Sequence, residues 1–147
     1  MDFFTAIEVS AQGLTAERAR INVASSNLAN AQTTQTPGGG PYRRKDVVLN
    51  AVQPSPQIVG AQAGNGLRGV SGVEVANVVE DTSPPRMEYD PGHPNANADG
   101  YVAYPNVNVI EEMVDMITAS RAYEAGLSAL KAAVNMAERA LSIGRGI

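Results

Sequence analysis

Residues 108–143 read NVIEEMVDMITASRAYEAGLSALKAAVNMAERALSI, and this proline-free stretch decides the fold. Two series of residues recur along it at intervals of seven. The first is Met113, Ser120, Leu127, Val134 and Leu141, and the second is Met116, Tyr123, Leu130 and Ala137. Two mostly apolar series offset by three residues are typical of a helix that packs along a coiled-coil seam. We therefore predict a helix over residues 108–143.

Both ends of this helix carry signals of their own. Asn108 is followed by Glu111, which is the spacing of an N-cap residue and an acid at the third helical position. Gly144 is a suitable stop, because glycine readily adopts the conformation that ends many helices.

A second repeat of seven lies near the start of the chain. Its main series is Ile7, Leu14, Ile21 and Leu28, and its partly polar companion series is Phe4, Ala11, Arg18 and Ser25. Thr5 and Glu8 have the spacing of a capping box, in which each side chain satisfies a free backbone N–H group. We predict a helix over residues 4–30.

Prolines divide the chain into three segments. All nine lie between Pro37 and Pro105, together with ten of the fourteen glycines, and both residue types break helices. We predict an N-terminal helix within residues 1–32, a middle segment over 33–106 and a C-terminal helix within 107–147. The fold class is mainly α, with two long terminal helices forming a coiled-coil layer and a small Pro/Gly-rich middle segment that contains β-strands.

The middle segment is predicted in more detail from its local composition. Residues 46–49 and 73–75 are strand-like, and 78–80 extend the second strand. Residues 53–72 have low complexity and are predicted to form a mobile loop. Residues 84–106 hold too many prolines for a central strand, so we expect extended chain with turns at 90–92 and 99–100.

Apolar surface outside the seam favours assembly with other chains. The C-terminal helix carries many small residues there, with three large ones: Ala119, Ala122, Ala125, Gly126, Ala129, Ala132, Ala133 and Ala140, with Val114, Ile117 and Ile143. Ordering the N-terminal helix costs on the order of 25–50 kcal/mol of backbone entropy. Each large apolar residue of its pattern returns only about 2 kcal/mol on burial. The alternative is a monomeric two-helix domain that leaves this face in water.

Composition excludes several classes of function. The net charge of −4 argues against general nucleic-acid binding, which needs a positive field. The absence of cysteine excludes disulfides, thiolate metal sites and cysteine nucleophiles. We find neither a cleavable signal peptide nor a run of about 20 apolar residues that would span a membrane.

Short motifs with catalytic or ligand-binding associations all lack their required context. Residues 64–69 match G-x-G-x-x-G without a following helix, and residues 95–100 resemble half of a calcium loop without its closing Glu. His93 is the only histidine, too few for a zinc site, and Ser128-x-x-Lys131 has no companion motif. We assign no catalytic, cofactor or metal residue. Arg43-Arg44-Lys45 is either a solvated strand start or a contact to an acidic neighbouring subunit.

Seven runs of sequence resemble the flagellar axial proteins. They are ASSNLANA at 24–31, PYR at 41–43, VVEDTSPP at 78–85, YDPGHP at 89–94, DGYVAYPNVN at 99–108, EEMVDMI at 111–117 and SRAY at 120–123. The Asn-Leu-Ala-Asn signature at 27–30 is shared by rod and hook proteins. The runs at 89–94 and 104–108 narrow the resemblance to subunits of the proximal rod, and it covers nearly the whole chain.

This resemblance implies a structural role rather than catalysis. Rod proteins leave the cell unfolded through the flagellar type III export apparatus, without a cleaved signal. They polymerise in the periplasm with their own copies and other rod subunits, forming a drive shaft whose inner layer is a coiled coil of terminal helices. Nothing in the resemblance implies a cofactor, a nucleic acid or a membrane span.

The expected assembly interface follows from the seams and from the signature. Its residues are Phe4, Ile7, Leu14, Ile21, Asn27, Leu28, Asn30, Met113, Met116, Tyr123, Leu127, Leu130, Val134 and Leu141. Asn27 and Asn30 either set the register between helices, as buried amides do in coiled coils, or cap the end of the N-terminal helix.

Two other classes of protein remain as alternatives. A peptidoglycan-acting hydrolase would use paired carboxylates such as Glu88 and Asp99 near His93. A cytoplasmic coiled-coil adaptor would use the same seams without being exported.

Overall fold

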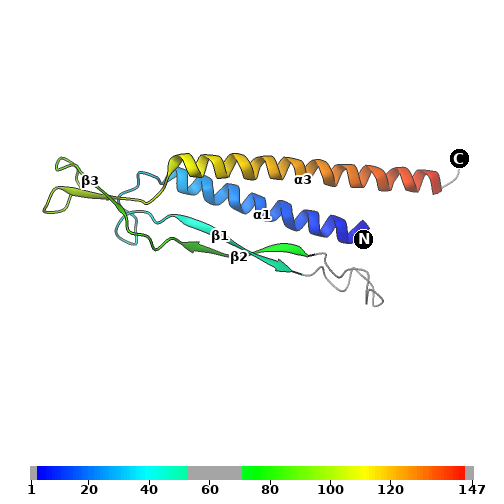
Figure 1. Cartoon of the computed structure of the whole chain (residues 1–147), viewed down its shortest axis with the longest axis horizontal. Coiled ribbons are helices and arrows are strands. Elements are labelled where there is room, and N and C mark those ends of the chain that lie inside the picture. The colour runs from blue at the N-terminus through cyan, green and yellow to red at the C-terminus, as the bar shows by residue number, and fades with distance from the viewer. Residues whose placement is uncertain (1–2, 53–70, 145–147) are drawn as a thin grey trace. The chain divides into compact units, whose positions relative to one another are not determined.

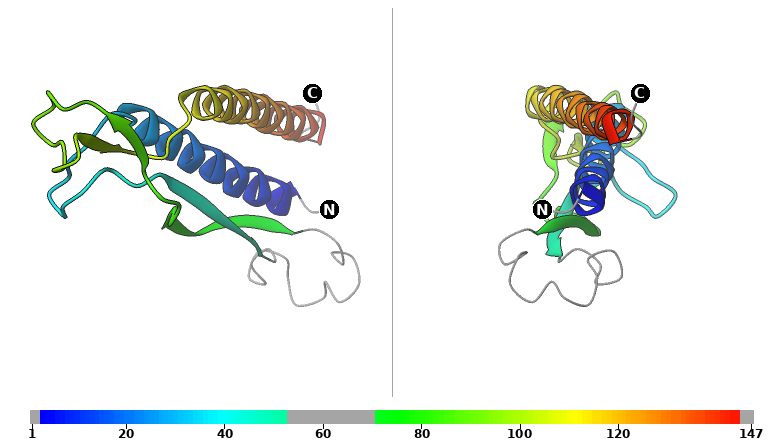
Figure 2. Two further views of the ribbon diagram at one scale, coloured as in Figure 1. Left: turned by 60° about the vertical axis from the view of Figure 1, so that its left-hand side comes forward. Right: turned by 90° about the vertical axis from the view of Figure 1, so that its right-hand side faces the viewer.

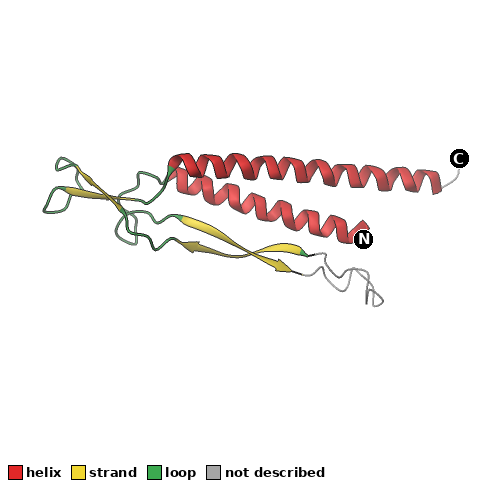
Figure 3. Ribbon diagram, in the orientation of Figure 1, coloured by secondary structure: helices red, strands yellow, loops and turns green. Residues whose placement is uncertain are grey.

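The computed structural model describes residues 3–52 and 71–144 (Figure 1). The elements, in chain order, are α1 (Phe3–Ala29), β1 (Lys45–Val52), β2 (Gly72–Glu80), β3 (Arg86–Tyr89), β4 (Tyr101–Tyr104) and α3 (Val109–Gly144). Both predicted helices are confirmed, each with ends within one residue of the prediction. Figure 3 marks the four strands in yellow within the stretch that joins the helices. The predicted loop over 53–72 and the glycine motif at 64–69 lie largely or wholly outside the described residues.

Contacts at the ends of the helices test the capping predictions. Asn108 caps α3, because its Oδ1 accepts the Ile110 N–H at 3.1 Å and its carbonyl accepts the Glu112 N–H at 3.0 Å. The predicted capping box at Thr5 is wrong, because α1 already includes Phe3 and places Thr5 inside the helix. The Thr5 side chain is fully buried, and its hydroxyl bonds to none of the described groups.

Strands β1 and β2 form a two-stranded sheet, seen from two further directions in Figure 2. Just beyond the sheet, the Asp81 N–H donates to the Arg44 carbonyl at 2.7 Å, so the start of β1 lies beside the end of β2. The predicted extension at 78–80 is confirmed, since β2 runs without a break from Gly72 to Glu80.

Strands β3 and β4 form an antiparallel hairpin in residues predicted only as extended chain. The partners are Arg86 with Tyr104, Met87 with Ala103, Glu88 with Val102 and Tyr89 with Tyr101. The predicted turns are confirmed: the His93 N–H donates to the Asp90 carbonyl and the Gly100 N–H to the Asn97 carbonyl. A strand in a two-stranded hairpin is always an edge strand, and edge strands tolerate nearby proline.

Two compact units make up the described chain. The first holds residues 3–18, 49–52, 71–76 and 119–144, and the second holds 19–48 and 77–118. The three-segment division predicted from the prolines remains a proposal about organisation along the chain.

Small and polar side chains fill the interior of both units. In the first unit Ala16 and Ala119 are buried, and a Cβ added to Gly126 would lie 3.1 Å from Leu14 Cδ2. Small residues therefore let the two helices approach closely there. In the second unit the buried apolar residues are Ala24, Ala31, Val102 and Val107. None of the described helices is long and apolar enough to cross a membrane.

Candidate assembly interface

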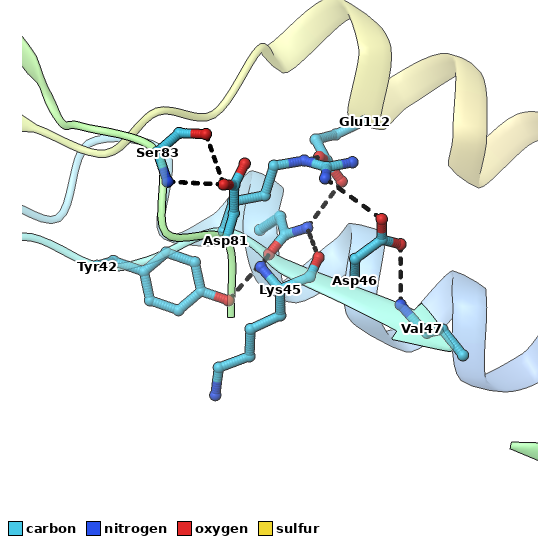
Figure 4. A network of polar contacts seen from close by, with 9 residues as sticks. Tyr42, Lys45, Asp46, Val47, Asp81, Ser83 and Glu112 are labelled. Atoms are coloured by element: carbon cyan, nitrogen blue, oxygen red, sulfur yellow. Dashed lines mark hydrogen bonds and ion pairs between the residues drawn. The ribbon is translucent and has the colours of Figure 1, made fainter. Parts of the chain in front are cut away.

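Asn27, near the end of α1, is the centre of a buried polar network in the second unit. Figure 4 labels Tyr42, Lys45 and Glu112 of this network. Its Nδ2 donates to the Lys45 carbonyl at 2.8 Å, and its Oδ1 accepts the Lys45 N–H at 2.9 Å. The same Oδ1 accepts the Tyr42 hydroxyl at 3.0 Å, and Nδ2 also donates to Glu112 Oε2 at 3.0 Å. Two donors and two acceptor positions exhaust the capacity of a carboxamide. Asn27 thus joins α1 to the start of β1 and the first turns of α3.

A buried ion pair continues this network on α3. Glu112 is only 2% exposed, and its Oε1 accepts the Arg44 Nε–H at 2.6 Å. Arg44 also lies 3.6 Å from Asp46, measured from Nη1 to Oδ2. A buried carboxylate needs such partners, because burying an unpaired charge is costly.

Two groups around the network have shifted pKa values. Burial lowers the pKa of Arg44, but the hydrogen bond and charge of Glu112 outweigh it, so the pKa is raised overall. The hydrogen bonds from the Ser83 hydroxyl at 2.6 Å and the Ser83 N–H at 2.8 Å lower the pKa of Asp81. Arg44 therefore keeps the positive charge that pairs with Glu112.

The residues expected to form the assembly interface differ widely in exposure. Phe4, Met113, Val134 and Leu141 are exposed. Nine are half-buried: Ile7, Leu14, Ile21, Leu28, Asn30, Met116, Tyr123, Leu127 and Leu130. Asn27 is buried within its own chain, where its bonds go to β1 and α3. The whole set remains a proposal for contacts between chains.

Asn30 has a different local role from Asn27. Its Nδ2 donates to the Ser26 carbonyl at 2.8 Å, and that carbonyl also accepts the Asn30 N–H at 3.1 Å. The Asn30 side chain thus adds a second donor to a carbonyl of the last turn, and Asn30 caps the end of α1.

The first turns of α3 carry an exposed apolar stripe, which we call the outer stripe. It consists of Ile110, Met113, Val114 and Ile117, which are 73%, 46%, 56% and 49% exposed. Their spacing places all four on one side of the helix. Ile110 and Ile117 each precede a buried residue, Glu112 or Ala119, by two positions, about 200° around the helix. The outer stripe therefore faces away from the contact with α1.

Polar residues end the outer stripe after two turns. Arg121 follows Val114 by seven residues and Glu124 follows Ile117 by seven, so each continues the same side of α3. Both are exposed. The outer stripe is thus confined to the start of the helix, where its four large side chains lie together.

The basic cluster and the catalytic candidates take separate places in the second unit. Arg44 is held by Glu112, whereas Arg43 is exposed and makes no ion pair with the described residues. Glu88 pairs with Arg86 at 3.6 Å, and His93 Nδ1 accepts the Asn95 N–H at 3.1 Å. Among the described residues no cluster of three or more His, Asp or Glu could hold a metal ion.

Comparisons with known proteins agree on one family for this chain. A family model described as "Flagella basal body rod protein" matches residues 7–35, and one described as "Flagellar basal body rod FlgEFG protein C-terminal" matches residues 98–143. Relatives named flagellar basal-body rod protein FlgC come from Borreliella burgdorferi and Bacillus subtilis. Each is 44% identical over 99% of this chain and 100% of its own length. The chain belongs to the FlgC family of flagellar basal-body rod proteins.

A further relative, from Aquifex aeolicus, is 40% identical over 95% of both chains. Membership in the FlgC family confirms several predictions made from the sequence. The protein is a structural subunit of the flagellar basal-body rod and not an enzyme. Assembly with other rod subunits follows from the family. The hydrolase alternative is therefore set aside.

Sequence reasoning missed the residues that tie the second unit together. Tyr42, Arg44 and Glu112 join Asn27 there, although Glu112 lies 85 positions further along the chain. Glu112 is adjacent to the exposed Glu111, and nothing in the local sequence distinguishes the buried acid from its neighbour. Nothing local identified the partner.

Proposed function

We propose that this FlgC-family protein polymerises into the periplasmic drive shaft of the flagellum, with the outer stripe of α3 as a main contact between subunits. The observation that carries the proposal is the exposure of Ile110, Met113, Val114 and Ile117 on the side of α3 opposite its own α1. An apolar patch at i, i+3, i+4 and i+7 is the pattern by which a helix docks on an apolar surface. Its burial by a neighbour would favour assembly.

Coiled-coil seams between subunits would complete the inner layer of the rod. Phe4 and Leu141 are 63% and 67% exposed in the first unit, so neither is satisfied within one chain. The buried interior of that unit is built largely from small residues such as Ala16 and Ala119, which return little free energy on folding. We propose that the helical ends become fully ordered only when neighbours cover them, which couples folding to assembly.

This coupling suits export before assembly. A chain that gains much of its stability from neighbours is easily kept unfolded while it passes through the flagellar type III export apparatus. Torque is then transmitted because each subunit is fixed to its neighbours through apolar contacts buried over long helices. A cytoplasmic adaptor with the same seams would remain in the cytosol, whereas a rod subunit would purify with basal bodies.

Placing a charge within the outer stripe tests this proposal. In a flagellated strain that lacks its own copy of the gene, Val114→Asp should abolish swimming and remove the protein from purified basal bodies. The purified variant should keep its helical circular dichroism, because the Asn108 cap and the Glu112 bonds are untouched. Ser128→Asp is the matched control on the same side of α3 beyond the stripe, and it should be tolerated. Normal swimming with Val114→Asp would reject the outer stripe as a contact.

A further inference from the structure

The β3–β4 hairpin presents two exposed tyrosines that contact each other. Tyr89 and Tyr101 are cross-strand partners whose ring centroids lie 5.3 Å apart at an interplanar angle of 66°. They are 65% and 43% exposed. Met87 lies two positions before Tyr89, on the same side of the hairpin, and is 52% exposed. Tyrosine and methionine are enriched at protein interfaces, so this surface, which we call the tyrosine face, is a candidate contact.

A glycine holds the tyrosine face in place. Gly100 has a φ of +81°, and a Cβ added to it would lie 2.9 Å from Tyr89 Cε2 and 3.3 Å from Pro91 Cβ. The Tyr89 ring is therefore seated against the hairpin before any partner arrives. A preorganised aromatic side chain loses little conformational entropy on binding.

The hairpin that carries the tyrosine face is acidic overall. Residues 86–104 carry three acids, Glu88, Asp90 and Asp99, against the single base Arg86, so the net charge of the hairpin is −2. Arg86 already pairs with Glu88, whereas Asp99 is exposed and no described residue forms an ion pair with it. A partner for this face should therefore be apolar with a positive rim.

The second unit contains a surface of that kind elsewhere. A cavity of about 360 Å³ lies between residues 39–44 and 81–85. Pro41, Tyr42, Pro84 and Pro85 contribute apolar walls, and the unpaired Arg43 lies among the lining residues. Its charged lining residues are Arg43, Arg44, which is paired with Glu112, and Asp81, which accepts two hydrogen bonds from Ser83, so Arg43 is the charge left for a partner.

We infer that the tyrosine face of one copy docks into this cavity on a second copy, with Asp99 of one paired to Arg43 of the other. The inference rests on the proposed polymerisation. Charge complementarity selects the partner, because the aromatic face carries the unpaired Asp99, the proline-lined cavity carries the unpaired Arg43, and neither surface matches itself. Two different surfaces in contact form a heterologous interface, which propagates from subunit to subunit along an open helical polymer.

Reversal of the paired charges tests this contact in cells that depend on the chain for swimming. Arg43→Asp and Asp99→Arg should each reduce swimming and the recovery of rods, with a loss of affinity on the order of tenfold. The double variant with Arg43→Asp and Asp99→Arg should restore swimming and rod recovery, since it re-forms the ion pair with the two charges exchanged. Combining Asp99→Arg with Lys131→Asp is the control and should restore nothing. Loss of swimming without restoration in the double variant would overturn the contact between copies and assign Arg43 to another rod subunit.

Cross-linking gives a second readout that does not depend on charge. The chain has no cysteine, so a disulfide between Thr82→Cys and Ala98→Cys would be unambiguous. Oxidised rods from cells that carry both should yield a ladder of multimers, whereas Ser142→Cys with Ala98→Cys should yield none. Swimming cells without a ladder would overturn the inference and leave the proposed function standing. A chain that never enters basal bodies, even unaltered, would overturn both.

Discussion

The side chain of Asn27 exchanges two hydrogen bonds with the backbone of Lys45, at 2.8 Å and 2.9 Å. A carboxamide on α1 thereby occupies the place that a neighbouring strand would take beside β1. Because the same amide reaches Glu112 on α3, one side chain fixes three segments of the second unit. The Asn-Leu-Ala-Asn signature thus begins with the residue that organises this unit and ends with Asn30, which caps the helix.

Replacing Asn27 should loosen the start of β1. Asn27→Ala leaves the Lys45 N–H and carbonyl without their buried partners, at a cost of about 1–3 kcal/mol. Hydrogen exchange at the Lys45 amide should accelerate by about fivefold or more. Asn27→Asp should be no milder, because it places a carboxylate beside Glu112. Asn22→Ala, at an exposed asparagine on the same helix, is the control. Equal Lys45 exchange in Asn22→Ala and Asn27→Ala would contradict the assigned role.

Removing the buried acid should destabilise the second unit more than removing its neighbour. Glu112→Ala removes the acceptor of the Arg44 Nε–H and one of the two acceptors of Asn27 Nδ2, and breaking one side of a buried pair costs about 3–5 kcal/mol. We expect the lower end, since the Arg44 side chain is 23% exposed and reaches water. Glu112→Gln keeps an acceptor and should cost less. Urea unfolding followed by circular dichroism measures both, with the exposed Glu111→Gln as control. Similar midpoints for Glu111→Gln and Glu112→Ala would argue against the network.

The positions of the two helices were predictable from sequence, because the signals for a helix and its ends are local. Which side of each helix is buried was not predictable in the same way. Repeats of seven and the Asn108 cap placed α1 and α3 within a residue. On α1, however, three of the four buried residues, Thr5, Ala16 and Asn27, recur at intervals of eleven, and Ile7 and Leu14 are only half-buried. In the second unit α1 contacts both β1 and α3, so a single seam toward one partner does not describe it.

The hairpin and the polar network escaped prediction for a different reason. Strands β3 and β4 have four residues each and pair across eleven others, so neither shows a clear alternation. The bond between Asn27 and Glu112 joins positions that only the folded chain brings together. The sequence pattern places Val114 and Ile117 on the alanine-rich face outside the seam and does not single out Ile110. It therefore does not predict the outer stripe as a separate surface.

Acid titration should detect the hydrogen bonds that Asp81 accepts in the turn after β2. Hydrogen bonds from Ser83 hold the pKa of Asp81 below its ordinary value of 3.8. A group with a lowered folded pKa stabilises the fold above its unfolded pKa, and this contribution disappears as the pH falls through the folded value. Ser83→Ala removes the largest cause, so the pKa of Asp81 should rise toward 3.8. Carboxyl NMR titration measures it, with Thr82→Ala as the control. An unchanged pKa of Asp81 in Ser83→Ala would refute the hydroxyl bond.

Gly100 should tolerate no side chain. Its φ of +81° is strained for any L-residue with a Cβ, by about 1–2 kcal/mol, and the added carbon would also press on Tyr89. Since the Asp90 N–H donates to the Gly100 carbonyl at 3.0 Å, distortion there should expose that amide. We expect Gly100→Ala to speed exchange at the Asp90 amide by at least about tenfold, because a tenfold change corresponds to about 1.4 kcal/mol.

Gly92→Ala is the matched control within the same hairpin. Gly92 does not have a positive φ, and its nearest neighbour, Asp90 Oδ1, would lie 3.6 Å from an added Cβ, an ordinary contact. Exchange at Asp90 should therefore change little in this variant. Because the tyrosine face depends on the same turn, Gly100→Ala should also weaken the ladder of cross-linked multimers, and Gly92→Ala should leave it intact. Equal exchange rates in the two variants would show that the Tyr89 ring is not seated on Gly100.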